Sequence, residues 1–320
     1  MRLGAARKKW AGLLALAVAL AFAIGTLWAR EKYEEKFEKT ESLARDGKVY
    51  LSNISGDIEI TSWSQNQVRI EAVKVSQASS ADKAKSNAAE VTIEVAREGD
   101  TLRIETKYPE RKGFFGRESM NVSINYKLQV PDRASVEVRS ISGDVTIASL
   151  GGPAKIRTTS GDVKINKATG VDVNLTSGDL TVENIAGDAY LKTVSGDIEV
   201  TTVKGSLEAA SVSGDIDFRD VSEARTATGK TVSGNITYIG TILAGGNYEF
   251  ESMSGDIEMT IPAGSGFDFE ANTFSGVIDT DFSIEVSGKL SRKEIHGTVN
   301  KGGARIRLKS FSGNIDLKKK

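Results

Sequence analysis

Ser-Gly-Asp recurs along much of this chain, and from Gly143 to Gly214 it returns every 17 or 18 residues. A further glycine halves most of these intervals, which divides the region into pieces of about nine residues. Counting the glycine as position 1, positions 3, 5 and 8 are almost always apolar, as in Val163, Ile165 and Ala168. Apolar residues at positions 3 and 5 have the period of a half-buried β-strand, so each piece predicts one strand and one corner.

A fixed period indicates a solenoid, because one unit cannot bury its apolar side alone and stacks on its neighbours. Two unlike strands per 18 residues predict a flattened parallel β-solenoid, with Ser-Gly-Asp at one of its two corners. Glycine supplies a backbone angle that other residues resist there, while serine and aspartate bond nearby backbone groups. An antiparallel meander with Ser-Gly-Asp hairpin turns would produce the same spacing, so it stays an alternative.

We expect the solenoid to occupy residues 136–320, with an insertion at about 279–303 that forms a protruding hairpin or loop. The last coil, which ends in three lysines, is expected to close the stack and to discourage another chain from pairing with its exposed end. Residues 49–135 predict an antiparallel β capping region with a hairpin turn at Glu98-Gly99-Asp100 and a surface helix or loop over 78–90.

The first thirty residues predict a membrane anchor. Nothing from Trp10 to Ala29 is charged, and twenty residues of helix span about 30 Å, the thickness of a bilayer's hydrocarbon core. The preceding basic cluster favours a cytoplasmic N-terminus, which gives a single-pass protein of the bacterial plasma membrane with its body outside the cytoplasm. A cleaved secretory signal is the alternative and exports the body too. The charged residues 31–48 are expected to form a solvated stalk, as a helix or as an extended lead-in.

Composition excludes several classes of function. The chain has no cysteine and one histidine, His296, so thiolate metal sites, cysteine nucleophiles and histidine-rich metal sites are excluded. Five of the 42 Lys and Arg lie in residues 1–30, which leaves 37 against 43 acids and a net charge of −6 for the rest. An acidic body is a poor nucleic-acid binder. No phosphate-binding glycine loop is present, because the glycines precede strands rather than open helices.

The ordered set of motifs ISGDIEITSW, REGDTLRI, YKLQVPDRASVEVRSISGDV, the Ser-Gly-Asp ladder and IPAGSGFDFEANTFSG resembles the bacterial β-strand-repeat family labelled "putative adhesin", a domain of unknown function. The likeness covers about residues 31–320, and the long 279–303 insertion departs from it. The resemblance implies an envelope protein with a solenoid-like domain behind one membrane anchor. It supplies no catalytic residue and no cofactor.

Two candidate sites follow from the residues. Stacked aspartates at the Ser-Gly-Asp corner would repel one another unless they are hydrogen-bonded to backbone or bridged by calcium; they are Asp144, Asp162, Asp179, Asp197 and Asp215. The backbone interpretation is preferred, because calcium-binding β-rolls carry two glycines per turn. The second site is the loop at 109–119, where Phe114, Phe115 and Arg117 suit contact with lipid headgroups or a partner. The alternative is that both rings fold under the capping sheet.

The sequence therefore predicts a membrane-anchored, extracytoplasmic β-solenoid that acts as a non-catalytic, adhesin-like binding or structural surface. Its partner would be an envelope polymer, a surface or another protein. An envelope-stress sensor or regulator is an alternative within the binding class. A carbohydrate-active β-helix enzyme is the alternative from another class, and it would need two carboxylates at a defined separation among outward residues such as Glu199, Glu208 and Asp217.

Overall fold

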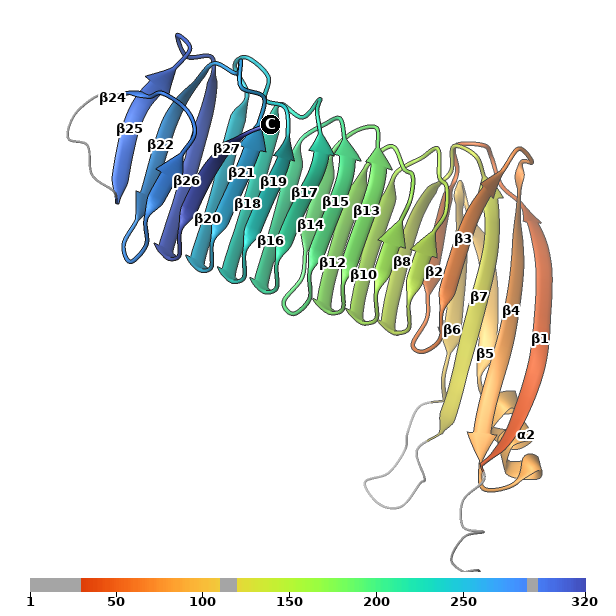
Figure 1. Ribbon diagram of the computed structural model, residues 1–320. Helices are drawn as coiled ribbons and strands as arrows, with labels where there is room; N and C mark the ends of the chain where they lie inside the picture. The colour runs from red at the N-terminus through yellow and green to blue at the C-terminus, as the bar shows by residue number, and fades with distance from the viewer. Residues whose placement is uncertain (1–29, 110–119, 287–292) are drawn as a thin grey trace, which may run out of the picture.

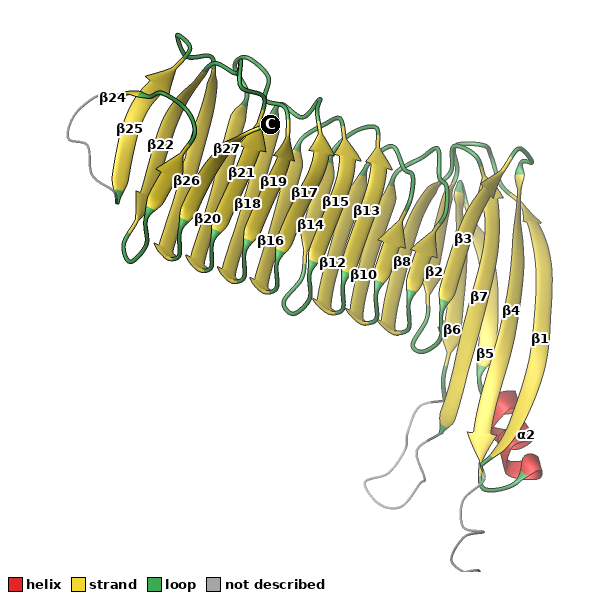
Figure 2. Ribbon diagram, in the orientation of Figure 1, coloured by secondary structure: helices red, strands yellow, loops and turns green. Residues whose placement is uncertain are grey.

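The computed structural model describes residues 30–109, 120–286 and 293–320. Within these ranges the chain is all β apart from the helix α2 (Ala81–Glu90), as Figure 2 shows. The predicted membrane span 10–29 and the loop residues Phe114, Phe115 and Arg117 lie outside the described ranges. No helix in the described part of the chain is long and apolar enough to cross a membrane.

Two mostly parallel sheets form the molecule. The first, sheet A, has 13 strands, which in spatial order are β1 (Glu31–Ser42), β4 (Gln67–Ala78), β7 (Asn121–Pro131), β3 (Ile58–Trp63), β9 (Val145–Ile147), β11 (Val163–Ile165), β13 (Leu180–Ile185), β15 (Ile198–Val203), β17 (Ile216–Val221), β19 (Ile236–Gly240), β21 (Ile257–Ile261), β27 (Ile315–Lys319) and β23 (Ile278–Thr280).

The second, sheet B, has 14 strands. In spatial order from the same end, they are β5 (Thr92–Glu98), β6 (Thr101–Lys107), β2 (Lys48–Ser52), β8 (Ser135–Ser142), β10 (Ala154–Ser160), β12 (Val171–Ser177), β14 (Ala189–Lys192), β16 (Leu207–Ser213), β18 (Thr226–Ser233), β20 (Asn247–Ser254), β26 (Ala304–Ser312), β22 (Phe267–Thr273), β25 (Glu294–Val299) and β24 (Glu285–Val286).

Each coil contributes one strand to each sheet, and Figure 1 shows the coils side by side along an arm. Successive repeats pair in parallel and in register, with Val163 beside Leu180 and Ile165 beside Val182. The parallel solenoid is therefore confirmed in its coarse form, and the antiparallel meander is wrong. The apolar positions of both sheets face each other and form one continuous buried cluster. They pack inward because alternate side chains of a strand point to opposite faces.

The solenoid begins earlier than predicted. β2 and β3 pair in parallel with β8 and β9, so residues 48–63 form the first coil rather than part of a cap. The Ser-Gly-Asp corner at Gly56 stacks directly on the corner at Gly143. A Cβ on Gly143 would lie 2.3 Å from the carbonyl oxygen of Gly56, so the two corners can lie this close only because Gly143 has no side chain. The predicted capping region is an insertion between β3 and β8. Its hairpin at Gly99 and its helix, which Ser80 caps, are as expected.

The solvated stalk predicted at 31–48 is wrong for most of its length. Glu31–Ser42 form β1, whose twelve residues all pair antiparallel with β4. Most of its charged side chains stay exposed, while Phe37 packs against the core. This apolar contact and the backbone pairing along the whole segment make it a strand. In Figure 1 the strands β1, β4 and β7 extend past one edge of the arm, with α2 at their far end.

The C-terminal coil also departs from its prediction. β26 lies between β20 and β22, and β27 lies between β21 and β23, so the last coil in sequence is internal in the stack. The terminal coil of the stack is instead that of β22 and β23, and β23 is the edge strand of sheet A. The insertion after it does form a hairpin, since β24 pairs antiparallel with β25. β25 in turn pairs with β22, so the hairpin continues the sheet.

Candidate binding surfaces

The Ser-Gly-Asp corners form one straight column along an edge of the arm. In spatial order its glycines are Gly56, Gly143, Gly161, Gly178, Gly196, Gly214, Gly234, Gly255, Gly313 and Gly276. A Cβ added to any glycine of this column would lie 1.9–2.3 Å from a backbone carbonyl oxygen of the neighbouring strand. The spacing between coils therefore leaves no room for a side chain at the corner.

The five predicted aspartates stack beside this column and are joined by hydrogen bonds. Oδ1 of Asp144 accepts the backbone N–H of Asp162 at 2.9 Å, and Oδ1 of Asp197 accepts that of Asp215 at 2.8 Å. The ladder continues at both ends through residues that the sequence analysis did not include: Asn125, Asp57, Asn235, Asp256 and Asn314. Each carboxylate or amide oxygen thus satisfies the next coil's N–H.

Calcium bridging of these aspartates remains a prediction. The backbone N–H partners are the arrangement preferred from the sequence, and a carboxylate that accepts such N–H groups is stabilised without a cation. No group of three or more acidic, histidine or cysteine side chains placed to hold a metal occurs within residues 30–109, 120–286 and 293–320.

Replacing one ladder acceptor should separate hydrogen bonding from charge. Asp197→Ala leaves the N–H of Asp215 without its acceptor, and we expect a loss of about 1 kcal/mol in the free energy of unfolding. Asp197→Asn keeps an acceptor, as Asn235 does naturally toward Asp256 at 2.9 Å, and should cost no more than a few tenths of a kcal/mol. Urea denaturation measures both. Equal losses in the two variants would contradict the ladder's role.

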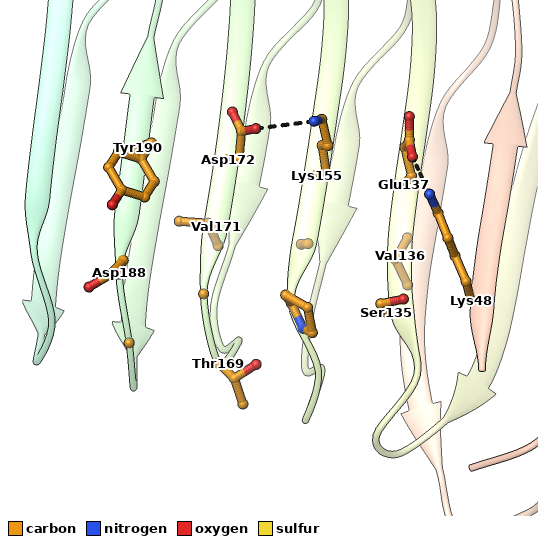
Figure 3. Close-up of a pocket in the computed structure, with 14 residues that line it drawn as sticks. Lys48, Ser135, Val136, Glu137, Lys155, Thr169, Val171, Asp172, Asp188 and Tyr190 are labelled. Atoms are coloured by element: carbon orange, nitrogen blue, oxygen red, sulfur yellow. Dashed lines mark hydrogen bonds and ion pairs between the residues drawn. The ribbon is translucent and has the colours of Figure 1, made fainter. Parts of the chain in front are cut away.

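A second feature is a shallow depression of about 620 Å³ on the outer face of sheet B. Figure 3 shows it across β2, β8, β10, β12 and β14, with Tyr190, Asp172, Lys155, Glu137 and Lys48 on neighbouring strands. It is hollow because the outward residues at the strand beginnings are small or lack a side chain: Ser135, Pro153 and Gly170. The next outward residue of each strand forms its wall.

These wall residues belong to one outward column that crosses the sheet. The register places Tyr50, Glu137, Lys155, Asp172 and Tyr190 side by side on consecutive strands. Tyr190 is 43% exposed, and Tyr50 carries the Arg103 guanidinium 4.3 Å from its ring centre. Four strand spacings separate the two rings, which is about 19 Å. Two aromatic rings thus bracket a row of charged groups.

The carboxylates in the depression are held as anions. A hydrogen bond from Lys48 lowers the pKa of Glu137, and a second from Arg139 acts in the same direction. The Arg157 guanidinium donates two hydrogen bonds of 3.0 Å to Asp172 and lowers the pKa of that carboxyl. Oδ1 of Asp188 accepts the N–H of Ser206 at 2.7 Å. The depression therefore offers fixed charges and hydrogen-bonding groups around an apolar ring.

The structure places two of the outward carboxylates considered for catalysis side by side and separates the third from them. Glu199 and Asp217 lie on adjacent strands of sheet A, whereas Glu208 lies on β16 in sheet B, on the opposite outer face. Each has a basic partner: Arg219 for Glu199 and Asp217, and Lys192 for Glu208. His296 is exposed on β25, 3.1 Å from Glu294, as its position beside a glycine indicated.

Sequence reasoning missed the depression because its residues come from strands about 18 residues apart. Only Tyr190 gave a local signal, as a large aromatic ring at the fourth position of the piece GDAYLKTVS, where the other pieces carry polar or small residues. An aromatic ring at an outward strand position is a common mark of a contact surface.

The comparison with known proteins identifies the family of the chain. A family model described as Toastrack DUF4097 matches residues 48–242 and 241–318, which confirms the resemblance predicted from the repeat. No curated protein matches the chain.

Three solved structures are similar to it. A "putative adhesin" from Bacteroides fragilis has 12% identity and a TM-score of 0.41 over 88% of this chain and 97% of that one. A "putative lipid binding protein" from Parabacteroides distasonis has 16% identity and a TM-score of 0.40 over 88% and 96%. A "putative adhesin" from the same species has 12% identity and a TM-score of 0.36 over 88% and 97%.

Proposed function

The chain belongs to the Toastrack DUF4097 family, and from this premise we propose that it is a non-catalytic, adhesin-like binding arm of the bacterial envelope. Residues 10–29 anchor it in the plasma membrane, and residues 31–320 lie outside the cytoplasm. The arm binds an extended, hydroxyl-rich envelope polymer across the outer face of sheet B.

The observation that carries this proposal is the outward column in the depression. Tyr190 presents a ring face to which the C–H face of a sugar can stack, and the adjacent Asp172 and Lys155 present an acceptor and a donor for hydroxyl groups. About 19 Å away, the Tyr50 ring carries the guanidinium groups of Arg103 and Arg139, 4.3 and 5.5 Å from its centre, and these groups are further donors for hydroxyl groups. A linear polymer laid across the strands would meet these groups in succession, whereas a small molecule would meet only one of them.

Electrostatics favour binding over catalysis at this surface. A glycosidase acid needs a raised pKa so that it holds a proton near neutral pH. Glu137 and Asp172 have lowered pKa values because lysine and arginine groups hydrogen-bond to them. Both are therefore acceptors rather than proton donors.

Cosedimentation with purified insoluble peptidoglycan tests the proposal. We expect the full-length chain in detergent to bind this polymer, and Tyr190→Ala to weaken binding about tenfold or more, as loss of a central aromatic contact does. Tyr33→Ala, which removes a half-buried ring on β1 far from the depression, is the matched control and should bind normally. Equal binding by Tyr190→Ala and the wild type would refute the assignment of this surface.

A further inference from the structure

The residue just before each Ser-Gly corner forms a second column, here called the corner row. In spatial order it consists of Ile54, Ile141, Thr159, Thr176, Val194, Val212, Val232, Met253, Phe311 and Phe274. Eleven large apolar side chains are exposed in the described part of the chain, and eight of them are the apolar members of this row. Such alignment over ten corners, about 43 Å, marks a contact surface rather than scattered exposure.

The row grows more apolar toward the end of the arm. Its most exposed members are Met253 at 59%, Phe311 at 58% and Phe274 at 65%. The rings of Phe274 and Phe311 stack with their centres 4.9 Å apart and an angle of 7° between their planes. Val277, which is 37% exposed, follows Gly276 in the same corner as Phe274. We call Met253, Phe311, Phe274 and Val277 the distal tip.

Charge changes at the same place. Along most of the row the neighbouring ladder is anionic, but in the last two coils Asn314 and Val277 occupy the ladder positions. Lys293 lies 5.9 Å from the ring centre of Phe274 and donates to its carbonyl oxygen. Lys309 lies on β26 two residues before Phe311, and its ion-pair partner Glu251 is also bonded to Lys230. Asp256 is the ladder carboxylate at the corner of Met253, and its Oδ1 accepts the backbone N–H of Asn314.

The N-terminal strands extend past the edge of the arm that carries the corner row. Val73 pairs with Asn125 at the level of the corner, and β4 continues five residues further to Ala78, about 16 Å. Glu31 pairs with Ala78 at that far end, so β1 begins beyond the edge of the arm that carries the row. The predicted membrane span ends at Ala29, two residues before β1.

We propose that the distal tip binds the surface of the bilayer in which residues 10–29 are anchored, an inference that rests on the anchoring part of the proposed function. The arm then contacts the membrane at two points, the anchor and the tip. The N-terminal strands reach about 16 Å past the corner row, so the tip must come down by that distance to meet the bilayer. A tilt of the whole arm of about 22° toward the membrane is enough, because it lowers the end of an arm about 43 Å long by about 16 Å. The rings enter the headgroup region and the two lysines meet anionic phosphates. The aspartates of the nearer coils keep the rest of the row away from the lipid.

Lipid quenching of single labels tests this proposal, because the chain has no cysteine of its own. Full-length Ser312→Cys carries an environment-sensitive fluorophore beside the tip, and Ser142→Cys carries it at the equivalent exposed position of an early coil. Both are reconstituted in vesicles of equal parts phosphatidylcholine and phosphatidylglycerol with headgroup nitroxides. We expect loss of fluorescence at Ser312 but not at Ser142, and recovery at Ser312 in a Phe274→Ser, Phe311→Ser background.

Several outcomes would overturn the proposal. Equal quenching of the two labels would do so, and so would shielding of the Ser312 label in detergent, where a second protein copy would be the contact. Resistance of the chain to extraction by alkaline carbonate tests the anchor separately. If the chain resists extraction and Ser312 is not quenched, the tip proposal fails while the anchor stands. If carbonate extracts the chain, the anchoring part of the proposed function fails and the tip proposal fails with it.

Discussion

Gly196→Ala should destabilise the protein by about 4 kcal/mol or more, a loss far beyond that of an ordinary surface substitution. Gly196 has a φ of 139°, a conformation that residues with a side chain rarely adopt, and an added Cβ would lie 2.0 Å from the carbonyl oxygen of Gly178. That oxygen belongs to the backbone of the preceding coil, so only a shift of one whole coil relative to the other could relieve the overlap. Urea denaturation followed by far-ultraviolet circular dichroism measures the loss.

Two other glycines separate the causes of this loss. Gly99 has a φ of 60°, and no heavy atom beyond its own chain neighbours lies within 4 Å of the position that an added methyl group would take, so Gly99→Ala should cost only the backbone strain, about 1–2 kcal/mol. Gly264→Ala meets neither the strain nor an overlap and should be almost neutral. If Gly196→Ala were no worse than Gly99→Ala, close stacking of the corners would not be what demands glycine.

Phe250→Ala should cost about 3–5 kcal/mol, because it removes the centre of an aromatic cluster. The Phe250 side chain is fully buried, and its ring centre lies 5.6 Å from that of Phe218 and 5.4 Å from that of Tyr238. Gly229 makes room for these rings, since a Cβ there would lie 2.9 Å from Phe218 and 3.1 Å from Phe250. The coils on either side are fixed by their corners and cannot collapse into the cavity.

The matched control for this core substitution is Tyr190→Ala, an equally drastic truncation on the outer face. It should cost less than about 1 kcal/mol, because the ring is 43% exposed and its loss leaves no internal cavity. The midpoint of urea denaturation compares the two variants. Similar midpoints would mean that the aromatic cluster does not hold the coils of the distal half together.

Local pattern accounts for what the sequence could predict. Val163 and Ile165 sit two apart after a glycine, so the strand, its buried face and its corner follow from a few neighbouring residues. The hairpin at Gly99 and the helix capped by Ser80 are equally local. Parallel stacking followed from the period, because one coil cannot bury its apolar face alone.

What the sequence could not predict depends on which coil lies beside which. The Ser-Gly corner recurs from coil to coil, so the pattern does not say that the Gly313 corner lies between those of Gly255 and Gly276. β1 was missed because its charged side chains stay in water while its backbone pairs fully with β4. The depression was missed since Glu137 and Tyr190 become neighbours of one surface only when the intervening strands β10 and β12 are placed in register.

The internal position of the last coil bears on how the protein is made. During synthesis the strands β22 and β23 emerge before β26 and β27, yet their native parallel partners are those later strands. Until β26 and β27 have been synthesised, β23 has no partner strand and β22 has only β25 beside it, so both strands present an unpaired edge. Assembly of this end therefore cannot proceed coil by coil from the N-terminus. A chain truncated before Ala304 would lack the internal strands β26 and β27 rather than the terminal coil.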